Sequence, residues 1–208
     1  DGYEIYAWNL FQSQTELNYV YVGLDGDGVG LIEYVDGDFI YHGALKGTYG
    51  EVRDITEHDG QIYYGVKEQG IVRLDTTKEQ EQNLLPGLKT PTSESTIYED
   101  FTLELYNNAI YVGSSNGLYI IESDVLKPCN VTDSKFTEEN LLIHRLIDDE
   151  DGKLWMVAFF NSGTENEQSE FGYFEVKNNE LKWNSNELAM LSEDVIFCLR
   201  KDRSGIHW

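Results

Sequence analysis

A short pattern recurs along this sequence: a Gly or Asn is followed three positions later by an aromatic residue. The clearest copy lies in residues 141–159, where an apolar run is followed by an acidic turn that closes on Gly152 and by a second apolar run that begins at Leu154. Two apolar runs joined by such a turn predict a β-hairpin. The copies are Asn18 with Tyr21, Gly60 with Tyr63, Asn108 with Tyr111, Gly152 with Trp155, and Gly205 with Trp208.

The spacing of the copies predicts the architecture. Successive aromatic residues lie about 42 to 53 positions apart, and each copy holds several short strands. A period of this length is typical of a β-propeller, whose blades are small sheets that pack against their neighbours. The expected fold is therefore all-β: a β-propeller of four-stranded blades, with about five blades present as a fragment of a larger disc. In this single partial domain the expected blades span residues 1–45, 46–92, 93–135, 136–190 and 191–208, the last being incomplete.

The Gly or Asn at the turn position is expected to be needed for its backbone conformation and not for a chemical role. Gly and Asn enter the left-handed backbone region at the lowest cost, which explains why these two types alternate there. A Gly also follows the aromatic residue closely in three copies, at Gly23, Gly65 and Gly113, whereas the fourth has Val157. The residues expected to be structural in the repeat are Asn18, Tyr21, Gly60, Tyr63, Asn108, Tyr111, Asp149, Gly152, Trp155, Asp202, Gly205 and Trp208.

The segments between the copies predict where blades begin and end. Residues 3–8 alternate and are expected to form a strand, either inner or outer, whereas 76–96 and 126–139 are expected to be connections. The fifth copy stops at Trp208 within an expected strand. Two interpretations follow: the native chain continues, or the strand at 3–8 closes the ring onto this last blade.

Ligand binding is expected on one face of the disc. In a propeller, the loops between second and third strands lie on the same face as the links between blades. The fourth copy carries a long loop there, at 161–170, which either contacts a partner or is an insertion without one. The candidate residues on this face are Asp25, Asp27, Gln69, Ser115, Asn116, Asn161 and Glu165.

Charge narrows the classes of partner. The chain has 15 basic and 38 acidic residues, for a net charge of −23. Nucleic acids and anionic lipid surfaces are therefore not expected partners, because both require Lys and Arg to neutralise phosphates. No run of about 18 apolar residues is present, so membrane attachment would come from regions outside this segment. The chain begins at Asp1 without Met, which leaves open a leader ahead of it.

No motif in the sequence indicates catalysis, a metal or a cofactor. The four histidines are scattered, and the loop Asp25-Gly-Asp-Gly28 departs from a calcium loop at Val29, which offers no side-chain oxygen. The acidic run at 148–151 is better explained by turn formation than by paired general acid and base groups. Cys129 and Cys198 are expected to be isolated thiols, with a disulfide between them left open.

Two of the copies resemble a known family of repeats. Residues 143–155 and 195–208 carry the pattern D-x-x-G-x-x-W of the two-component regulator propeller repeat, whereas the other three copies have Tyr in place of Trp, and two of them have Asn in place of Gly. That family forms the extracytoplasmic sensor regions of hybrid histidine kinases in Bacteroidetes, and its members typically detect oligosaccharides. The residues that match are Asp149, Gly152 and Trp155, and Asp202, Gly205 and Trp208.

The resemblance implies a periplasmic, ligand-sensing segment of an inner-membrane two-component sensor, without enzymatic activity of its own. Its partners would be a small carbohydrate, the remainder of the sensor chain and, as an open question, a second copy. Two alternatives remain at this point. One is a propeller scaffold for protein–protein interaction, and the other is a propeller lyase or glycosidase, which would need His, Arg or acidic side chains gathered at the channel mouth.

Overall fold

The computed structural model describes residues 6–75, 81–88, 100–137, 141–148, 152–177 and 180–185. These residues form four antiparallel sheets of four strands each, and within every sheet the strand order follows the chain. The predicted all-β fold with four-stranded sheets is confirmed. The chain divides into two compact units, which are Asp1–Pro86 with Glu99–Leu103, and Gly87–Tyr98 with Glu104–Trp208.

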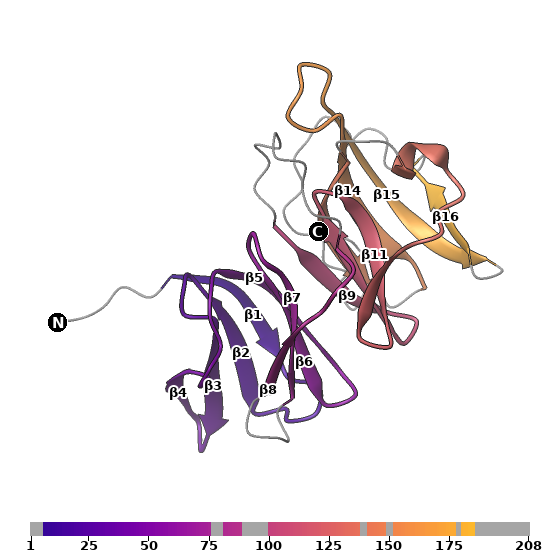
Figure 1. Cartoon of the computed structure of the whole chain (residues 1–208). Coiled ribbons are helices and arrows are strands. Elements are labelled where there is room, and N and C mark those ends of the chain that lie inside the picture. The colour runs from indigo at the N-terminus through magenta and orange to yellow at the C-terminus, as the bar shows by residue number, and fades with distance from the viewer. Residues whose placement is uncertain are drawn as a thin grey trace. The chain divides into compact units, whose positions relative to one another are not determined.

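The first unit contains the first two sheets (Figure 1). The strands of the first sheet are β1 (Ala7–Gln12), β2 (Tyr19–Leu24), β3 (Val29–Val35) and β4 (Asp38–Ala44). Those of the second sheet are β5 (Val52–His58), β6 (Gln61–Val66), β7 (Gly70–Asp75) and β8 (Glu81–Leu84). Strand β5 packs against β1 and β2 of the preceding sheet, as a blade packs on its neighbour.

The second unit contains the fourth sheet and most of the third. The strands of the third sheet are β9 (Thr102–Tyr106), which begins in the first unit, β10 (Ala109–Ser114), β11 (Gly117–Glu122) and β12 (Val125–Pro128). The 3₁₀ helix η1 (Ser134–Thr137) precedes the fourth sheet, of β13 (Leu142–Asp148), β14 (Leu154–Phe160), β15 (Gln168–Lys177) and β16 (Glu180–Asn184). Strand β13 packs against β10 and β11, the second and third strands of the preceding sheet, whereas β5 packs against the first and second strands of its preceding sheet.

Tight turns join many of the strands. Four hairpins have two-residue turns in which both residues have positive φ, the pattern of a type I′ turn that matches the twist of the flanking strands. Of the turn residues expected to be left-handed, Gly60, Asn108 and Gly152 have positive φ, whereas Asn18 does not, because a six-residue loop joins β1 to β2. The type I′ pairs are Asp36-Gly37, Asp59-Gly60, Asn107-Asn108 and Ser123-Asp124.

The repeated aromatic residues are buried at equivalent positions in the second strand of each sheet. Tyr21, Tyr63, Tyr111 and Trp155 are between 3% and 8% exposed. Trp155 stacks on Phe171 with ring centroids 5.3 Å apart. The remaining repeat residues Asp149, Asp202, Gly205 and Trp208 lie outside the described residues, as does the expected blade at 191–208.

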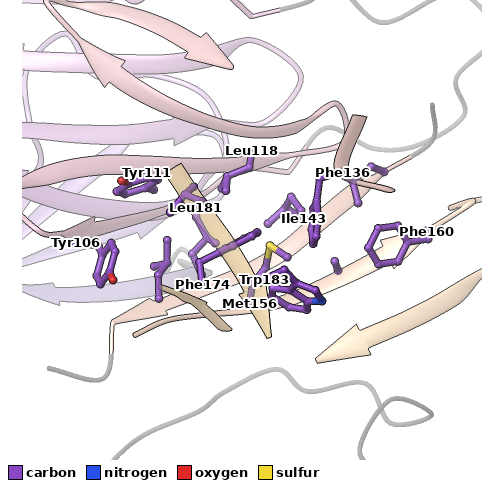
Figure 2. Close-up of a cluster of buried hydrophobic side chains, with 14 residues drawn as sticks. Tyr106, Tyr111, Leu118, Phe136, Ile143, Met156, Phe160, Phe174, Leu181 and Trp183 are labelled. Carbon is purple, nitrogen blue, oxygen red and sulfur yellow. The ribbon is translucent and has the colours of Figure 1, made fainter. Parts of the chain in front are cut away.

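Phe136 of η1 packs into the hydrophobic core of the second unit (Figure 2). Phe136 contacts Phe160, Phe174 and Trp183 with ring centroids 5.1 to 5.5 Å apart. Lys135, the neighbour of Phe136, places its ammonium 2.5 Å from a carboxylate oxygen of Glu170 on β15. These ring contacts and this ion pair attach the link between the third and fourth sheets to the core of the fourth sheet.

Some expected boundaries of strands and connections differ from those in the structure. The connection expected at 76–96 contains β8, and the one at 126–139 begins with the end of β12 and includes η1. The expected loop at 161–170 is shorter, since β15 begins at Gln168. Of the strand expected at 3–8, residues 3–5 lie outside the described residues, and β1 covers Ala7–Gln12. Outer strands such as β8, with the sequence EQNL, are short and polar, so they carry no alternating pattern to reveal them.

Candidate functional site

Three segments of the first unit meet at the face where ligand binding was expected. In the β2–β3 loop, the Gly28 amide donates to the Gly50 carbonyl at 2.9 Å, and the Gly50 amide donates to Gly26 at 3.0 Å. The Lys67 amide of the β6–β7 turn donates to Glu51 at 2.9 Å. The link between β4 and β5 therefore lies between the two loops. We call this surface the loop face of the first unit.

Glycines permit this close approach. Gly28 has a φ of 78°, and a Cβ built on it would lie 2.4 Å from the Tyr49 amide nitrogen. Thr48 fixes the link from the inside, since its hydroxyl donates to the Leu45 carbonyl at 2.8 Å and accepts from the Val29 amide at 3.0 Å. The loop face is thus formed by backbone contacts before any ligand binds.

A cluster of charged side chains around Trp8 occupies this end of the first unit. The Arg53 guanidinium lies 3.6 Å from the centroid of the Trp8 ring and forms an ion pair with Glu51. Its Nε is 3.7 Å from an Asp100 carboxylate oxygen, and the Lys67 ammonium is 3.2 Å from the other oxygen of Glu51. We call these five residues the Trp8–Arg53 platform.

The platform can bind a planar or ring-shaped ligand. Trp8 remains 48% exposed although Arg53 covers part of it, and Arg53 is held by two carboxylates before a ligand arrives. An exposed indole offers a stacking surface for the C–H face of a sugar ring. Carboxylates and guanidinium groups then accept from and donate to the hydroxyl groups at the rim of that ring.

Two buried carboxylates of β5 have structural roles. Asp54, 5% exposed, accepts from Asn9 Nδ2 at 2.5 Å, from the Thr102 hydroxyl at 3.0 Å and from the Leu103 amide at 3.0 Å. It therefore joins β1 and β9 to its own strand, β5. With its lone pairs taken by fixed donors, this carboxylate is not a general acid or base.

Glu57 repeats this arrangement at the opposite end of β5. It is 3% exposed and accepts from the Ser13 hydroxyl at 2.8 Å, from the Gln14 amide at 2.7 Å and from the Thr15 hydroxyl. All three donors belong to the β1–β2 loop. The carboxylate takes the place of a tight turn and explains why that loop needs no left-handed Asn18.

The structure brings three of the sequence-predicted ligand residues together. Asp25 and Asp27 are exposed on the β2–β3 loop, where Asp27 forms a parallel bridge with Gly50. Gln69, on the β6–β7 turn, is close to the same link: a Cβ built on Gly50 would lie 3.4 Å from its Nε2. These three residues therefore surround the link that leads into the platform.

The other four candidates lie in the second unit, on two different loops. Ser115 and Asn116 form the β10–β11 turn, where the Asn116 amide donates to Ser114 at 3.1 Å and Ser115 is buried. Asn161 and Glu165 belong to the β14–β15 loop, which projects from the fourth sheet (Figure 1). The two pairs thus belong to loops of two different sheets.

The β14–β15 loop has a defined internal structure. Glu167 accepts from the Gly163 amide at 2.9 Å and from the Ser162 hydroxyl at 3.2 Å. The Thr164 amide donates to the Asn161 carbonyl at 3.1 Å, and Asn161 adopts a positive φ of 52°. These hydrogen bonds within the loop stabilise its shape.

All five platform residues were missed by the sequence analysis. Trp8 and Arg53 are each the second residue of the first strand of a sheet, while Glu51 and Asp100 lie just ahead of β5 and β9. The sequence does hold one indication of the platform: when the first strands of the copies are aligned, Trp8 and Arg53 occupy the same position.

Metal chemistry and thiol chemistry find no support in the described part of the chain. No group of three or more His, Cys, Asp or Glu residues there could hold a metal ion. Burial raises the pKa of Cys129 to about 12, so its thiol stays protonated. Cys198 lies outside the described residues, and no helix among those described is long and apolar enough to span a bilayer.

No family model and no curated protein matches this sequence. Among solved structures, the extracellular domain of a one-component system protein of B. thetaiotaomicron is 15% identical, with a TM-score of 0.55 over 97% of this chain and 31% of that chain. The extracellular domain of a hybrid two-component system protein of the same organism is 18% identical, with a TM-score of 0.50 over 83% of this chain and 22% of that chain.

These similarities show the fold. They confirm, for the fold, the resemblance to extracytoplasmic sensor regions that the D-x-x-G-x-x-W pattern indicated. The chain spans about a fifth of the length of one neighbour and a third of the other. An α-L-arabinofuranosidase of Clostridium thermocellum is 11% identical over 88% of this chain and 73% of that chain, with a TM-score of 0.47. Because this TM-score is below 0.5, it supports no conclusion about glycosidase activity.

Proposed function

We propose that this chain is a ligand-sensing segment of the extracytoplasmic, periplasmic region of a two-component system protein, and that its loop face binds an oligosaccharide. The observation that carries the proposal is the fold similarity to the extracellular domain of a one-component system protein over 97% of the chain. In this proposal the four sheets are blades of a larger propeller.

The ligand is neutral in this proposal. Arg53 and Lys67 are balanced by Glu51 and Asp100, and the exposed carboxylates of Asp25 and Asp27 lie on the same face. The whole chain carries a net charge of −23. A sugar with uronate or sulfate groups would be repelled, whereas the hydroxyl groups of a neutral sugar can use both the carboxylates and the guanidinium.

Binding would act by shifting a population. A ligand that stacks on Trp8 and bonds to the β4–β5 link favours those arrangements of the blades in which both contacts form together. The remainder of the sensor chain would read that shift. The segment itself then needs no catalytic group.

The test is a binding measurement with neutral and uronate-containing oligosaccharides of matched length, by calorimetry on the 208-residue chain. Trp8→Ala should weaken binding of a neutral oligosaccharide by about tenfold or more, because it removes the stacking surface. Tyr34→Ala is the matched control, since Tyr34 is 49% exposed and Trp8 48%. Failure of the wild-type chain to bind any neutral oligosaccharide would reject the proposed ligand class.

One observation favours a second function, that of an interaction scaffold. Strand β4 at the edge of the first sheet exposes three large apolar side chains in a row, Phe39, Ile40 and Tyr41. This feature is independent of the loop face.

A further inference from the structure

The first and fourth sheets carry an aromatic side chain at the same position of the outer strand. In the first sheet, Tyr41 of β4 pairs with the residue two positions after Gly30, and a Cβ built on that glycine would lie 3.1 Å from the tyrosine ring. In the fourth sheet, Trp183 of β16 pairs with the residue two positions after Gly172, and a Cβ there would lie 2.7 Å from the indole. Each ring therefore lies over a glycine of the third strand.

The ring and the glycine occur together. The glycine lies opposite the residue that follows the repeated aromatic residue of the second strand. At that place the second and third sheets have Val72 and Tyr119, and their outer strands have Gln82 and Leu126 where the first and fourth sheets have the ring. An aromatic ring can lie against a strand in this way only where no side chain stands beneath it.

In the fourth sheet the ring is covered by the link ahead of β13. Trp183 is 9% exposed, and Phe136 of η1 contacts it with ring centroids 5.2 Å apart (Figure 2). The Lys135 ammonium is 5.5 Å from the centroid of the same indole. The Trp183 Nε1 donates to a Glu170 carboxylate oxygen at 3.2 Å, and Lys135 pairs with that oxygen at 2.5 Å. A cation and the aromatic residue after it thus cover a ring and its carboxylate.

The same link also pairs with the outer edge of β16. The Leu181 amide donates to the Asn130 carbonyl at 3.1 Å, and the Thr132 amide donates to the Leu181 carbonyl at 3.2 Å. Leu181 corresponds to Phe39 of β4, because each lies two positions ahead of the ring. The β3 partner of Phe39 donates its amide to the segment that leads into β2, so the backbone groups of Phe39 point to the outer edge of the first sheet.

In the first sheet the equivalent surface is open. Tyr41 is 44% exposed and Phe39 is 72% exposed. A carboxylate lies near this ring too: burial and the negative charge of Asp27 raise the pKa of Tyr41, and Asp27 is exposed three positions ahead of Gly30. We call Phe39, Tyr41 and the Asp27 carboxylate, with Gly30 beneath the ring, the Tyr41 face.

We propose that the Tyr41 face binds an extended segment of a partner protein in which a cationic residue is followed directly by an aromatic one. This inference deepens the scaffold function and does not depend on carbohydrate binding. The segment runs parallel to β4 and pairs with Phe39. Four positions further on, its cation reaches Asp27, and the next residue packs its ring on Tyr41, as the link does in the fourth sheet.

Charge and burial identify this occupant. A carboxylate beside an aromatic ring favours an ammonium or guanidinium group, and the net charge of −23 attracts a basic segment. A second copy does not offer its own Lys135 and Phe136, because Phe136 is 8% exposed within the core of its own second unit. Two copies of this acidic chain also repel each other. The occupant is therefore a segment of another protein.

The probe is a synthetic peptide of residues 130–137, which reproduces the covering segment, and calorimetry with the 208-residue chain measures its binding. Tyr41→Ala should weaken binding by about tenfold or more, because it removes the ring on which the peptide packs. Leu84→Ala is the control, since Leu84 is 54% exposed on the outer strand of the next sheet, and it should leave binding unchanged. A wild-type chain that does not bind the peptide, or a Tyr41→Ala chain that binds it as well as the wild type, would overturn the proposal.

A charge exchange tests the contact with Asp27. A peptide with Lys135→Glu should bind the wild-type chain about tenfold or more weakly, and Asp27→Lys in the chain should restore its binding. Losses that simply add when both changes are combined would show that the two side chains do not meet. A chain that binds the peptide but no neutral oligosaccharide keeps this inference and loses the proposed ligand class, and the converse result has the converse meaning.

Discussion

Buried polar side chains fix the positions of single strands in the first unit. Asp54 and Glu57 lie on the same strand, and each accepts hydrogen bonds from backbone and side-chain donors of neighbouring segments. A buried carboxylate is stable only when such donors surround it. The two residues therefore specify which segments meet at β5. Hydrophobic contacts alone are less directional and would define these neighbours less narrowly.

The buried tyrosines of the repeat make stability fall at high pH. Burial raises the pKa of Tyr21 and of Tyr111 to about 12, against about 10 for an unfolded tyrosine. Below pH 10 both states are protonated and the stabilising contribution is complete. Between about pH 10 and 12 the unfolded chain releases protons that the folded chain keeps, so the free energy of unfolding decreases as the pH rises.

Urea unfolding at a series of pH values in this range measures the effect. Tyr111→Phe keeps the buried ring but removes the ionisable hydroxyl, and it should reduce the pH slope by up to about 1.4 kcal/mol per unit. Tyr6→Phe, at a side chain that is 61% exposed, is the control and should leave the slope as it is. An unchanged slope in Tyr111→Phe would show that Tyr111 ionises alike in both states.

At the scale of elements, glycines in second strands let the next segment come close. A Cβ on Gly23 would lie 2.5 Å from the Val52 carbonyl oxygen, and one on Gly65 would lie 2.6 Å from the Phe101 Cβ. Both glycines follow the repeated tyrosine by two positions, as does Gly113 in the third copy. The missing side chain at these positions leaves room for the next segment of the chain. This packing explains why a Gly follows the aromatic residue, which the hairpin turn alone does not require.

Gly65→Ala tests this spacing. The φ of Gly65 is not in the left-handed region, so alanine fits the backbone and only the contact with Phe101 changes. We expect the free energy of unfolding in urea to fall by about 1 to 3 kcal/mol, the usual cost of overpacking. Ala44→Val, which adds two methyl groups at an exposed position of β4, should change it by less than about 0.5 kcal/mol. Equal effects of the two substitutions would contradict the steric explanation.

At the scale of the whole molecule, the net charge of −23 opposes the compact state. The ion pairs within the described residues offset only a small part of this excess. Added salt screens repulsion between exposed carboxylates more than it screens contacts that are partly buried.

The midpoint temperature of thermal unfolding should therefore depend on the salt concentration. We expect the midpoint temperature to rise between about 0.01 and 0.15 M ionic strength and to level off as the Debye length falls below the spacing of surface charges. NaCl and KCl should act equally at equal ionic strength, because screening does not depend on the cation. A midpoint that falls with salt would mean that attractive ion pairs outweigh the repulsion.

The sequence by itself determined the hairpins and their repetition, because left-handed turn residues and alternating apolar strands are local requirements. The Asp-Gly and Asn-Asn turns, the buried aromatic residue of the four described copies and the four-stranded, all-β organisation could all be predicted from such short segments. The same logic failed for β8 and β12, since outer strands are partly exposed and lack a periodic pattern.

Only the tertiary structure decided which distant residues meet. Trp8, Arg53 and Asp100 come from three separate strand regions and gather only when the link at Gly50 lies between two loops. The open edge at β4 was equally invisible, because whether another segment covers an outer strand depends on residues that are distant in the sequence. Side-chain convergence depends on distances across the fold, and a period along the chain carries no information about them.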